Sequence, residues 1–306
     1  MKIALPLMLF LTIVINYIFL KITLKYSYVD KPSTKLKIHK KPIPLSGGIS
    51  IVASILLALT LSNLAGFIPL KDTLFYLLYL IFPAMMILFI GLLDDRGLVQ
   101  AKTRITAQAI FSLIPITTLF INLKIDNILD FTTLALLAIL FIVGTIAAVN
   151  MSDGMDGLCG GLLLVTFAGM IFVNKLPSLN CFLIIIIISL IGFLFYNFNP
   201  AKVFLGNSGS EFLGFLIAAI SIYLFVLNSE PIKIFLIMVM IGLPLIDMTS
   251  SVIRRIKNKK DIMSGDRNHI YDQLLKNGYN QKQTWVIMMM FQIVVVTLSV
   301  FFFQYF

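Results

Sequence analysis

The sequence predicts an all-α integral membrane protein with about ten transmembrane helices, and three observations support this class. Of the 306 residues, 59% are hydrophobic and only 12% are charged, whereas about a quarter of the residues in a soluble domain are charged. Apolar runs of 18 or more residues recur along the whole chain, as in membrane spans. These runs do not alternate between polar and apolar residues, so we expect helices rather than the strands of a barrel.

The apolar runs predict ten helices within a single polytopic domain over residues 1–306. They cover residues 3–20, 46–66, 73–93, 105–123, 131–149, 158–173, 178–196, 210–228, 232–253 and 284–305. The first run has only Lys2 before it and several lysines behind it, the opposite of a secretory signal peptide, so we expect a retained helix. Pro83, Pro115 and Pro244 lie within spans and should kink their helices.

The basic residues orient these helices. A net charge of +10 would suggest nucleic acid in a soluble protein, but here the charges lie in loops between apolar runs, so we expect membrane lipids and no nucleic acid as partners. The loops after the odd-numbered helices hold 19 of the 24 Lys and Arg residues. The positive-inside rule therefore places these loops in the cytoplasm and both termini outside. Neither Cys159 nor Cys181 has the spacing of a disulfide or a metal site.

The acidic residues gather on the same side of the membrane as the basic loops. Ten of the 14 Asp and Glu residues lie there, several of them at the ends of predicted helices. Orientation does not require this, since acidic residues contribute little to it. Carboxylates collected at one face beside basic loops suggest metal and phosphate chemistry, in a site assembled from cytoplasmic loops.

The first motif is the pair Asp94 and Asp95, followed by Lys102 and Arg104. Adjacent carboxylates repel each other, and each would cost about 2.5–3.5 kcal/mol if drawn to the centre of a membrane helix. A divalent cation or a proton-transfer task would explain why both are present. The alternative is an ordinary charge cluster at a helix end, paired with Arg96.

The second motif covers residues 150–158, in which Asp153 and Asp156 are each followed by a glycine. Ser152 or Asp153 could cap the following helix, and the helix dipole would favour Asp156 in its first turn. Capping explains one acid but not two acids with two glycines. The glycines permit a tight loop and the close approach of backbone amides to a ligand, which favours a binding loop.

The third motif covers residues 197–211, a polar turn with glycines just before the eighth predicted helix. The first N–H groups of that helix are available to bind a phosphate. Phe204 could stack on a nucleotide base, although an aromatic residue in so apolar a chain more often serves packing.

The fourth motif covers residues 37–48 and includes His39 and Lys40. Its lysines could simply extend toward lipid phosphates. The Pro-x-Pro and Gly-Gly elements that follow predict a rigid turn, which such lysines do not need.

The fifth motif covers residues 254–274 and includes Arg267 and His269. Its loop is long for a membrane connection, so we expect it to fold over the site. A lone histidine is usually structural. The chain has only two, however, and both lie in basic cytoplasmic loops, which favours a role in the site.

Taken in order, these five segments resemble the polyprenyl-phosphate N-acetylhexosamine-1-phosphate transferases, the WecA/MraY-like enzymes of the glycosyltransferase family 4 type. The resemblance runs from about His39 to Gly278. It implies that a polyprenyl phosphate such as undecaprenyl phosphate attacks the β-phosphate of a UDP-HexNAc, giving polyprenyl-diphospho-sugar and UMP. Mg²⁺ or Mn²⁺ would offset the charge of the diphosphate. It also implies an enzyme of the bacterial plasma membrane that initiates a cell-envelope polysaccharide, with a homodimer as a possible assembly.

The resemblance also implies where each part of the reaction lies. The lipid phosphate is expected near Asp94 and Asp95, the nucleotide sugar in the loop that holds Asp153, and the diphosphate near His269. The expected catalytic residues are Asp94, Asp95, Asp153, Asp156 and His269. The expected substrate-binding residues are His39, Lys40, Lys102, Asn150, Asn197, Phe204, Gly206 and Arg267, of which Asn197, Phe204 and Gly206 match residues that hold the uridine. The expected metal ligands are Asp94, Asp95, Asn207 and Glu211.

Two positions depart from the family pattern. Asn207 stands where the family normally has an aspartate that binds the metal. An amide oxygen can ligate Mg²⁺ but brings no charge, so our hypothesis is that Glu211, one helical turn on, supplies the carboxylate. Tyr271 and Asp272 replace further histidines near the sugar, so the accepted sugar need not be plain GlcNAc.

Two other classes of protein remain as alternatives. A secondary transporter would carry its acids near the middle of helices and show inverted repeats, whereas these acids lie at one face and no repeat is evident. A homologue without activity, acting as a scaffold or lipid-binding protein, is favoured only by Asn207.

Overall fold

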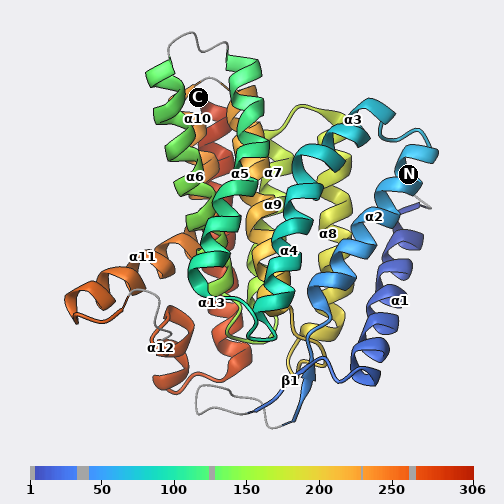
Figure 1. Cartoon of the computed structure of the whole chain (residues 1–306), viewed down its shortest axis with the longest axis vertical. Helices are drawn as coiled ribbons and strands as arrows, with labels where there is room; N and C mark the ends of the chain where they lie inside the picture. Colours follow the sequence, from blue (N-terminus) through green and yellow to red (C-terminus); the bar gives the residue numbers. More distant parts are fainter. Residues whose placement is uncertain (1–3, 33–40, 124–127, 229, 262–266) are drawn as a thin grey trace.

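The computed structural model describes residues 4–32, 41–123, 128–228, 230–261 and 267–306, and it is a bundle of helices (Figure 1). The helices that cover the predicted spans are α1 (Ala4–Lys25), α2 (Gly47–Leu64), α3 (Leu70–Phe75) with the π-helical η1 (Tyr76–Ile81) and α4 (Phe82–Asp94), α5 (Ala101–Leu123), α6 (Ile128–Met151), α7 (Leu158–Val173), α8 (Pro177–Asn197), α9 (Gly206–Leu227), α10 (Pro231–Val239) with α11 (Gly242–Lys257), and α13 (Gln281–Tyr305). The short α12 (Ile270–Lys276) lies between α11 and α13. Strand β1 (Val29–Asp30) pairs antiparallel with β2 (Ile43–Pro44), with Val29 opposite Pro44.

The all-α membrane class is confirmed. In the described part of the chain, seven helices are long and apolar enough to cross a membrane, or eight if α10 and α11 form one bent span. The apolar helix α7 is shorter than such a span. All ten predicted spans are helical, and ten crossings stay a prediction.

Pro244 lies just beyond the sharpest bend of the bundle, where α10 and α11 meet at 77°. Proline has no N–H, so it leaves the carbonyl of Met240, four residues earlier, without its helical donor. Thr166 Oγ1 donates to this carbonyl over 3.1 Å, and Gln292 Nε2 donates over 2.8 Å. Side chains from α7 and α13 therefore stabilise the bend, and α11 turns away from the bundle axis (Figure 1).

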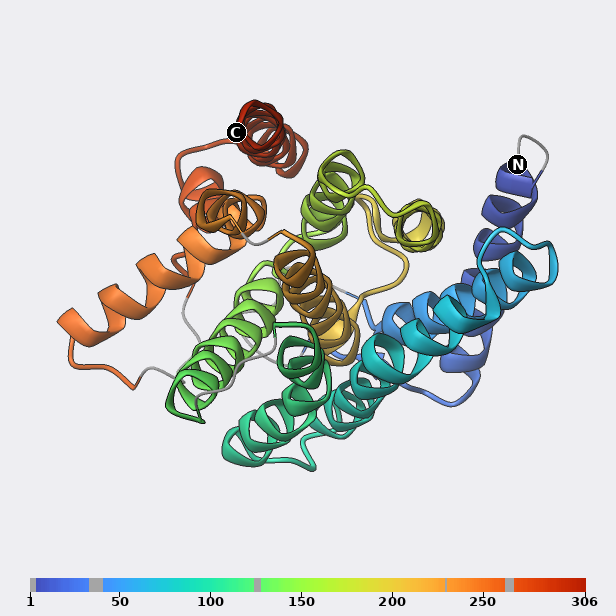
Figure 2. The ribbon, with the colours of Figure 1, turned by 90° about the horizontal axis from the view of Figure 1, so that it is seen from above.

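Helix α9 is buried over most of its length and lies in the middle of the bundle, with α1 and α11 toward opposite ends (Figure 2). Its first turn approaches α2 and α4 at glycines. A Cβ atom on Gly48 would lie 2.6 Å from Gly209 Cα, and one on Gly91 would lie 2.5 Å from Ser208 Cα. Small residues allow such close approach between membrane helices, so the first turn of α9 is held firmly against the end of α4.

The two termini lie at one end of the bundle, and the described parts of the five motifs lie toward the other (Figure 1). This arrangement agrees with a topology in which both termini share a side of the membrane and the acidic loops face the opposite side. The fold thus collects the predicted site residues that the structure describes at one end of the bundle.

Candidate active site

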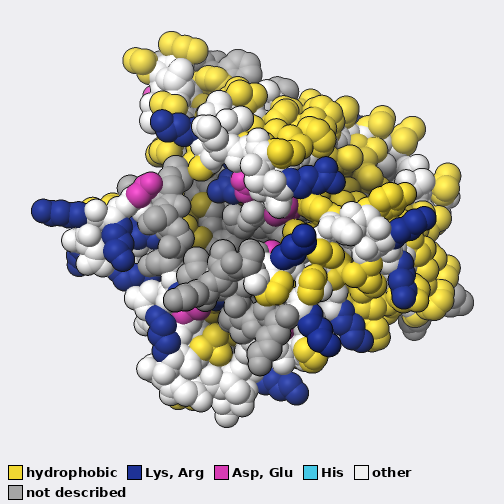
Figure 3. All heavy atoms as spheres, turned by 60° about the horizontal axis from the view of Figure 1, so that its bottom comes forward, with side chains coloured by type: hydrophobic (Ala, Val, Ile, Leu, Met, Phe, Trp, Pro, Cys, Tyr) yellow, Lys and Arg dark blue, Asp and Glu magenta, His cyan; other side chains and the backbone are white. Residues whose placement is uncertain are grey.

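A cavity of about 1060 Å³ opens at the end of the bundle where the acidic loops meet. Its volume suits a substrate the size of a nucleotide sugar. Figure 3 shows this face, with acidic side chains in a hollow and Lys and Arg side chains around it. Ten of the predicted site residues line the cavity: Asp94, Asp95, Asn150, Asp153, Asp156, Asn197, Phe204, Gly206, Asn207 and Arg267.

Asp95 follows the last residue of α4 and binds the N-terminus of α9. Its carboxylate accepts hydrogen bonds from the backbone N–H of Asn207 over 2.8 Å and of Ser208 over 3.3 Å, and from the Tyr28 hydroxyl over 3.1 Å. Burial raises the pKa of Asp95, and the hydrogen bonds from Asn207 and Ser208 oppose this shift. The N–H groups that the sequence suggested for a phosphate are therefore already bound by an aspartate.

Gly206 makes the approach of Asp95 to α9 possible. Its φ of +74° lies in the left-handed region, where a side chain is strained. A Cβ atom here would also lie 2.9 Å from Asp95 Oδ2. Gly206 lines the cavity, and its conformation explains why glycine stands at this position.

Asp94, the last residue of α4, turns to a different set of donors. Its Oδ2 atom accepts hydrogen bonds from Arg104 Nη1 over 2.5 Å and from Asn207 Nδ2 over 2.9 Å. The basic partner is thus Arg104 of α5, whereas the exposed Arg96 lies over the ring of Tyr28. Among the described residues, no hydrogen bond reaches Oδ1 of Asp94, so this oxygen is available to a ligand in the cavity.

Glu211 lies behind the cavity wall. Its side chain is only 1% exposed, and Oε1 lies 3.2 Å from Arg104 Nε. It is not among the residues that line the cavity. Glu211 therefore faces Arg104 instead of the position where we expected it to bind a metal.

Asp156 ties together the second and third motifs. Its Oδ2 atom accepts hydrogen bonds from Asn199 Nδ2 over 3.0 Å and from the backbone N–H of Ala201 over 3.1 Å. Asn197 completes the connection, since its side chain accepts a hydrogen bond from Gly157 N–H and donates one to the Val203 carbonyl. Asn197 is buried and its amide is used within the protein, so the geometry gives it a structural role at the cavity wall.

Asp153 differs from these acids because no hydrogen bond reaches its carboxylate within the described residues. It does not cap α7, whose N-cap is Gly157 with φ +71°, and Ser152 donates to the Ala148 carbonyl instead. Burial raises the pKa of Asp153 well above its ordinary value, and the nearby carboxylates of Asp95 and Asp156 raise it further. Asp153 is thus an uncompensated acid on the cavity wall.

Phe204 lies at the cavity, half-buried, at the junction of the third and fourth motifs. Its backbone N–H donates to the Pro44 carbonyl over 2.8 Å, and its carbonyl accepts from Gly47 N–H over 3.0 Å. The predicted Pro-x-Pro turn therefore supports the cavity wall at Phe204. His39 and Lys40 lie outside the described residues.

Two further predicted binding residues, Asn150 and Lys102, lie differently with respect to the cavity. Asn150 lines the cavity, and its Oδ1 atom accepts a hydrogen bond from Ser210 Oγ over 2.8 Å, which joins α6 to α9. Lys102 is exposed in the first turn of α5 and does not line the cavity.

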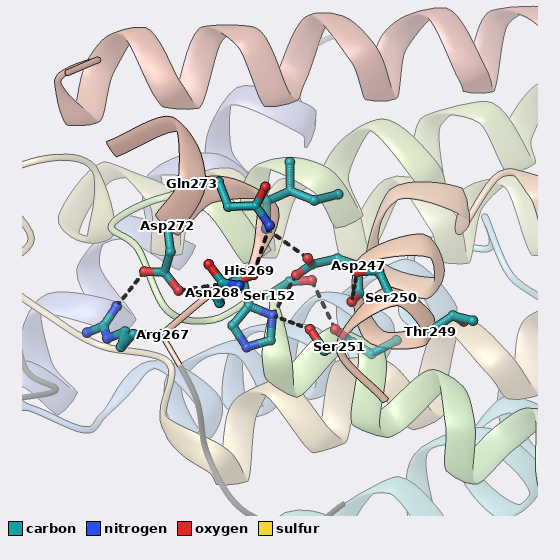
Figure 4. Close-up of polar contacts among 12 residues, drawn as sticks. Ser152, Asp247, Thr249, Ser250, Ser251, Arg267, Asn268, His269, Asp272 and Gln273 are labelled. Atoms are coloured by element: carbon teal, nitrogen blue, oxygen red, sulfur yellow. Dashed lines mark hydrogen bonds and ion pairs between the residues drawn. The ribbon is translucent and has the colours of Figure 1, made fainter. Parts of the chain in front are cut away.

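His269 is the N-cap of α12 and is bound to the bent helix α11 (Figure 4). Its Nδ1 atom lies 2.8 Å from Asp247 Oδ2, and Asp247 Oδ1 accepts the N–H of Ile270, also over 2.8 Å. His269 is only 5% exposed and does not line the cavity. Asp247 was not predicted as a site residue. The available signal was an acid within an apolar span, three residues after Pro244.

Tyr271 connects this cluster to the loop of Asp153. Its ring stacks on His269 with centroids 5.5 Å apart and an angle of 7° between the planes. Its hydroxyl packs so closely on Gly154 that a Cβ atom there would lie 1.8 Å away. Arg267, which lines the cavity, is held by Asp272 over 3.2 Å. The described part of the long loop thus lies beside the cavity through Arg267 and contacts the Asp153 loop through Tyr271.

A divalent cation fits the chemistry of this cavity. Within the described residues no three His, Cys, Asp or Glu side chains form a preformed metal cluster. Asp153 is nevertheless crowded by other carboxylates and has no donor of its own, and Asp94 keeps one free oxygen. Oxygen ligands of this kind are those that Mg²⁺ and Mn²⁺ prefer, and a substrate diphosphate would add more.

The chain is similar to known proteins over most of its length. A profile described as glycosyl transferase family 4 matches residues 77–225. A probable undecaprenyl-phosphate N-acetylglucosaminyl 1-phosphate transferase from Bacillus subtilis (strain 168) is 30% identical over 287 residues, which cover 90% of this chain and 77% of the relative. The undecaprenyl-phosphate alpha-N-acetylglucosaminyl 1-phosphate transferase of Escherichia coli (strain K12) is 31% identical over 282 residues, or 87% of this chain and 74% of the relative. Its Yersinia pestis counterpart is 30% identical over 281 residues, with the same coverage.

Proposed function

The chain belongs to glycosyl transferase family 4, and from this premise we propose that it transfers an N-acetylhexosamine 1-phosphate from a UDP-sugar to undecaprenyl phosphate. An oxygen of the lipid phosphate attacks the β-phosphorus of the UDP-sugar. The bond from this phosphorus to the bridging oxygen breaks, and UMP leaves with the electron pair. The products are undecaprenyl-diphospho-sugar and UMP.

The observation that carries this proposal is the cavity itself. It lies at the end of a membrane bundle, is large enough for a nucleotide sugar, and has aspartates from two separate loops on its wall. Phosphoryl transfer needs little covalent chemistry from the protein, so catalysis depends on positioning and on compensating charge. An acidic cavity that is bordered by Lys and Arg and lined in part by Leu20 and Leu24 of α1 suits a lipid phosphate, a diphosphate and a cation.

The lipid-phosphate end is assigned to Asp94 and its surroundings. Arg104 and Asn207 hold one oxygen of Asp94 and leave the other for the cavity. Asp95 holds the first turn of α9 in place beside it. Since a phosphate monoester is largely ionised near neutral pH, no strong base is needed, and these residues act by orienting the nucleophile and its counter-ion.

The nucleotide end is assigned to the opposite wall. Phe204 offers an aromatic face to the uracil, a use that we favour over packing because the side chain is only half-buried beside the cavity. Asn150 is close to the same wall, and Arg267, held by Asp272, can bind a phosphate oxygen. His269 acts from behind the wall by holding α12 and Arg267 near the diphosphate.

Mg²⁺ or Mn²⁺ would be held by Asp153 and the free oxygen of Asp94, and when bound it would neutralise charge on the diphosphate. Asp153 is suited to this role because it has no competing hydrogen bond in the described structure and lies near two other carboxylates. We also propose that the site faces the cytoplasm of the plasma membrane, on the charge distribution of the loops, and that the product initiates a cell-envelope polysaccharide.

The test is release of UMP by the purified protein from a panel of UDP-N-acetylhexosamines, with undecaprenyl phosphate and Mg²⁺ each present or omitted. We expect release only when all three components are present, and the panel identifies the sugar. Asp153→Asn serves as the inactive control. Absence of release with every sugar, while the protein remains folded, would contradict the proposal and favour a scaffold.

A further inference from the structure

Three helices meet behind Asp94, and each contributes one charged residue. Asp94 ends α4, Arg104 lies in the first turn of α5, and Glu211 lies in the second turn of α9. Arg104 Nη1 is 2.5 Å from Asp94 Oδ2, while Arg104 Nε is 3.2 Å from Glu211 Oε1. One guanidinium therefore bridges a carboxylate on the cavity wall and a carboxylate buried behind it.

Building on the proposed function, we propose that Glu211 is a positioning residue that acts on Asp94 through Arg104, and that it is not itself a ligand in the cavity. The two carboxylates bind different nitrogens of a planar, rigid guanidinium. The position of Arg104 is thereby fixed from α9, and Arg104 in turn fixes the rotation of the Asp94 side chain.

The charges support the same assignment. Arg104 alone beside Asp94 would cancel the negative charge that Asp94 presents to a cation. An ionised Glu211 on the other side of the guanidinium compensates Arg104, and the three residues together then retain one negative charge. Glu211 Oε2 is buried without a hydrogen-bond partner in the described structure. A carboxylate in that position is costly, which is understandable if its charge is needed by Arg104.

Asn207 fits this arrangement better than an acid would. Its Nδ2 atom donates to the same Asp94 oxygen that Arg104 binds, over 2.9 Å. A carboxylate at this position could not donate and would repel Asp94. Because Arg104 and Asn207 both donate to Oδ2 of Asp94, they fix the side chain with its other oxygen, Oδ1, free for a ligand. The acid that compensates the charge of Arg104 is Glu211, one helical turn beyond Asn207 along α9.

The experiment is a double-mutant cycle on Mn²⁺ binding to the purified full-length protein, followed by electron paramagnetic resonance without substrate. The variants are Glu211→Gln, Arg104→Gln and the double variant. We expect Glu211→Gln to weaken Mn²⁺ binding about 10- to 100-fold, as for other partners of ligating groups. The double variant should bind Mn²⁺ no more weakly than Arg104→Gln alone, because Glu211 acts only through the guanidinium that is then absent.

A direct ligand would behave differently. If Glu211 binds the metal itself, the double variant will bind Mn²⁺ more weakly than Arg104→Gln alone, and the proposal is overturned. The proposal is also overturned if Glu211→Gln binds Mn²⁺ as tightly as the wild-type protein does. It is overturned as well if the wild-type protein does not bind Mn²⁺ in the absence of substrate. The control is Glu230→Gln, which removes an exposed glutamate paired with Lys233 outside the cavity and should leave binding unchanged.

Two further measurements, of folding and of turnover, cover the cases in which a variant does not fold or the wild-type protein is inactive. If Glu211→Gln does not fold, Arg104→Lys replaces it, since an ammonium keeps the charge but cannot present two nitrogens to the two carboxylates. We then expect several-fold weaker binding, and unchanged binding would overturn the proposal. Because Mn²⁺ binding needs no UDP-sugar, an inactive wild-type protein would contradict the proposed function without affecting this cycle. Where turnover is present, its loss across the three variants should follow the loss of metal affinity.

Discussion

Asp95 and Asp153 lie on the same cavity but have opposite environments. Burial raises the pKa of both carboxyl groups. Asp95 nevertheless accepts hydrogen bonds from two N–H groups of α9 and from Tyr28. In the described structure Asp153 accepts none and has two carboxylates nearby. The protein therefore stabilises one aspartate and leaves the other uncompensated.

This difference between Asp95 and Asp153 indicates that the two aspartates have different roles, one in the structure of the site and one in ligand binding. A buried polar group without a partner costs stability, so native proteins keep few of them. When one lines a large cavity, a ligand is the natural partner. We infer that Asp95 mainly builds the site, by joining α4 to α9, whereas Asp153 mainly serves the ligand. Stability and turnover can distinguish these roles.

The largest effect is expected for Asp153→Asn. The amide has nearly the same shape but no charge, so turnover should fall roughly 1000-fold, within the range for loss of a charge-stabilising group. Thermal stability in detergent without metal should be unchanged or higher, because repulsion from Asp95 and Asp156 is removed. Added Mg²⁺ should no longer stabilise the protein. The measurements are UMP release and the unfolding midpoint with and without Mg²⁺.

A matched control for this prediction is Asp130→Asn. Asp130 is exposed in the first turn of α6, away from the cavity, and its substitution should leave turnover and the response to Mg²⁺ unchanged. If Asp153→Asn destabilises the metal-free protein as much as Asp95→Asn does, the two aspartates do not have the different roles inferred above.

Asp95→Asn should combine a loss of turnover with a loss of stability. An asparagine keeps one acceptor oxygen, but its NH₂ group would face the N–H groups at the start of α9. Hydrogen bonds to charged groups contribute about 1.5–3 kcal/mol each to the free energy of unfolding, so we expect a loss of about that size. Thermal unfolding of the metal-free protein measures it, and an unchanged midpoint would show that Asp95 does not hold α9.

Much of the fold was predictable because long apolar runs permit few structures. Each predicted span is helical, and the kink predicted at Pro244 lies at the bend that divides one of them into α10 and α11. The size of that bend was not predictable, since it depends on Thr166 and Gln292, which reach Met240 from other helices. The number of crossings also could not be derived from apolar runs alone.

The wall of the site was predictable in outline, because polar and glycine-containing turns at one end of the bundle must meet there. The partners of its residues were not. Asn207 and Asp94 are 113 positions apart in the sequence, and Asp247 and His269 are 22 apart across a bend. Arg104 and Glu211 were visible as charges, but only the packing of α5 against α9 shows that they pair.

Gly206→Ala, which alters the contact between Asp95 and α9, is expected to lower stability and turnover by an intermediate amount. The left-handed conformation costs an L-residue about 1–2 kcal/mol, and the added Cβ would press on Asp95 Oδ2. We expect a loss of stability of that size and roughly tenfold lower turnover. Gly144→Ala is the control, because a Cβ atom on this helical glycine meets nothing within 4 Å. Equal effects of the two substitutions would contradict a specific role for Gly206.

The smallest effect is expected for Tyr28→Phe, which removes one of the three donors to Asp95 and leaves both N–H groups of α9 in place. A single hydrogen bond contributes about 0.5–1.5 kcal/mol, so the unfolding midpoint should fall slightly and turnover should fall only a few-fold. Tyr26→Phe is the matched control, since Tyr26 is 74% exposed and should be neutral. If Tyr28→Phe instead abolished turnover while stability held, the Tyr28 hydroxyl would act on the substrate. Asp95 would then belong with Asp153 among the residues that serve the ligand, and the division between the two aspartates would fail.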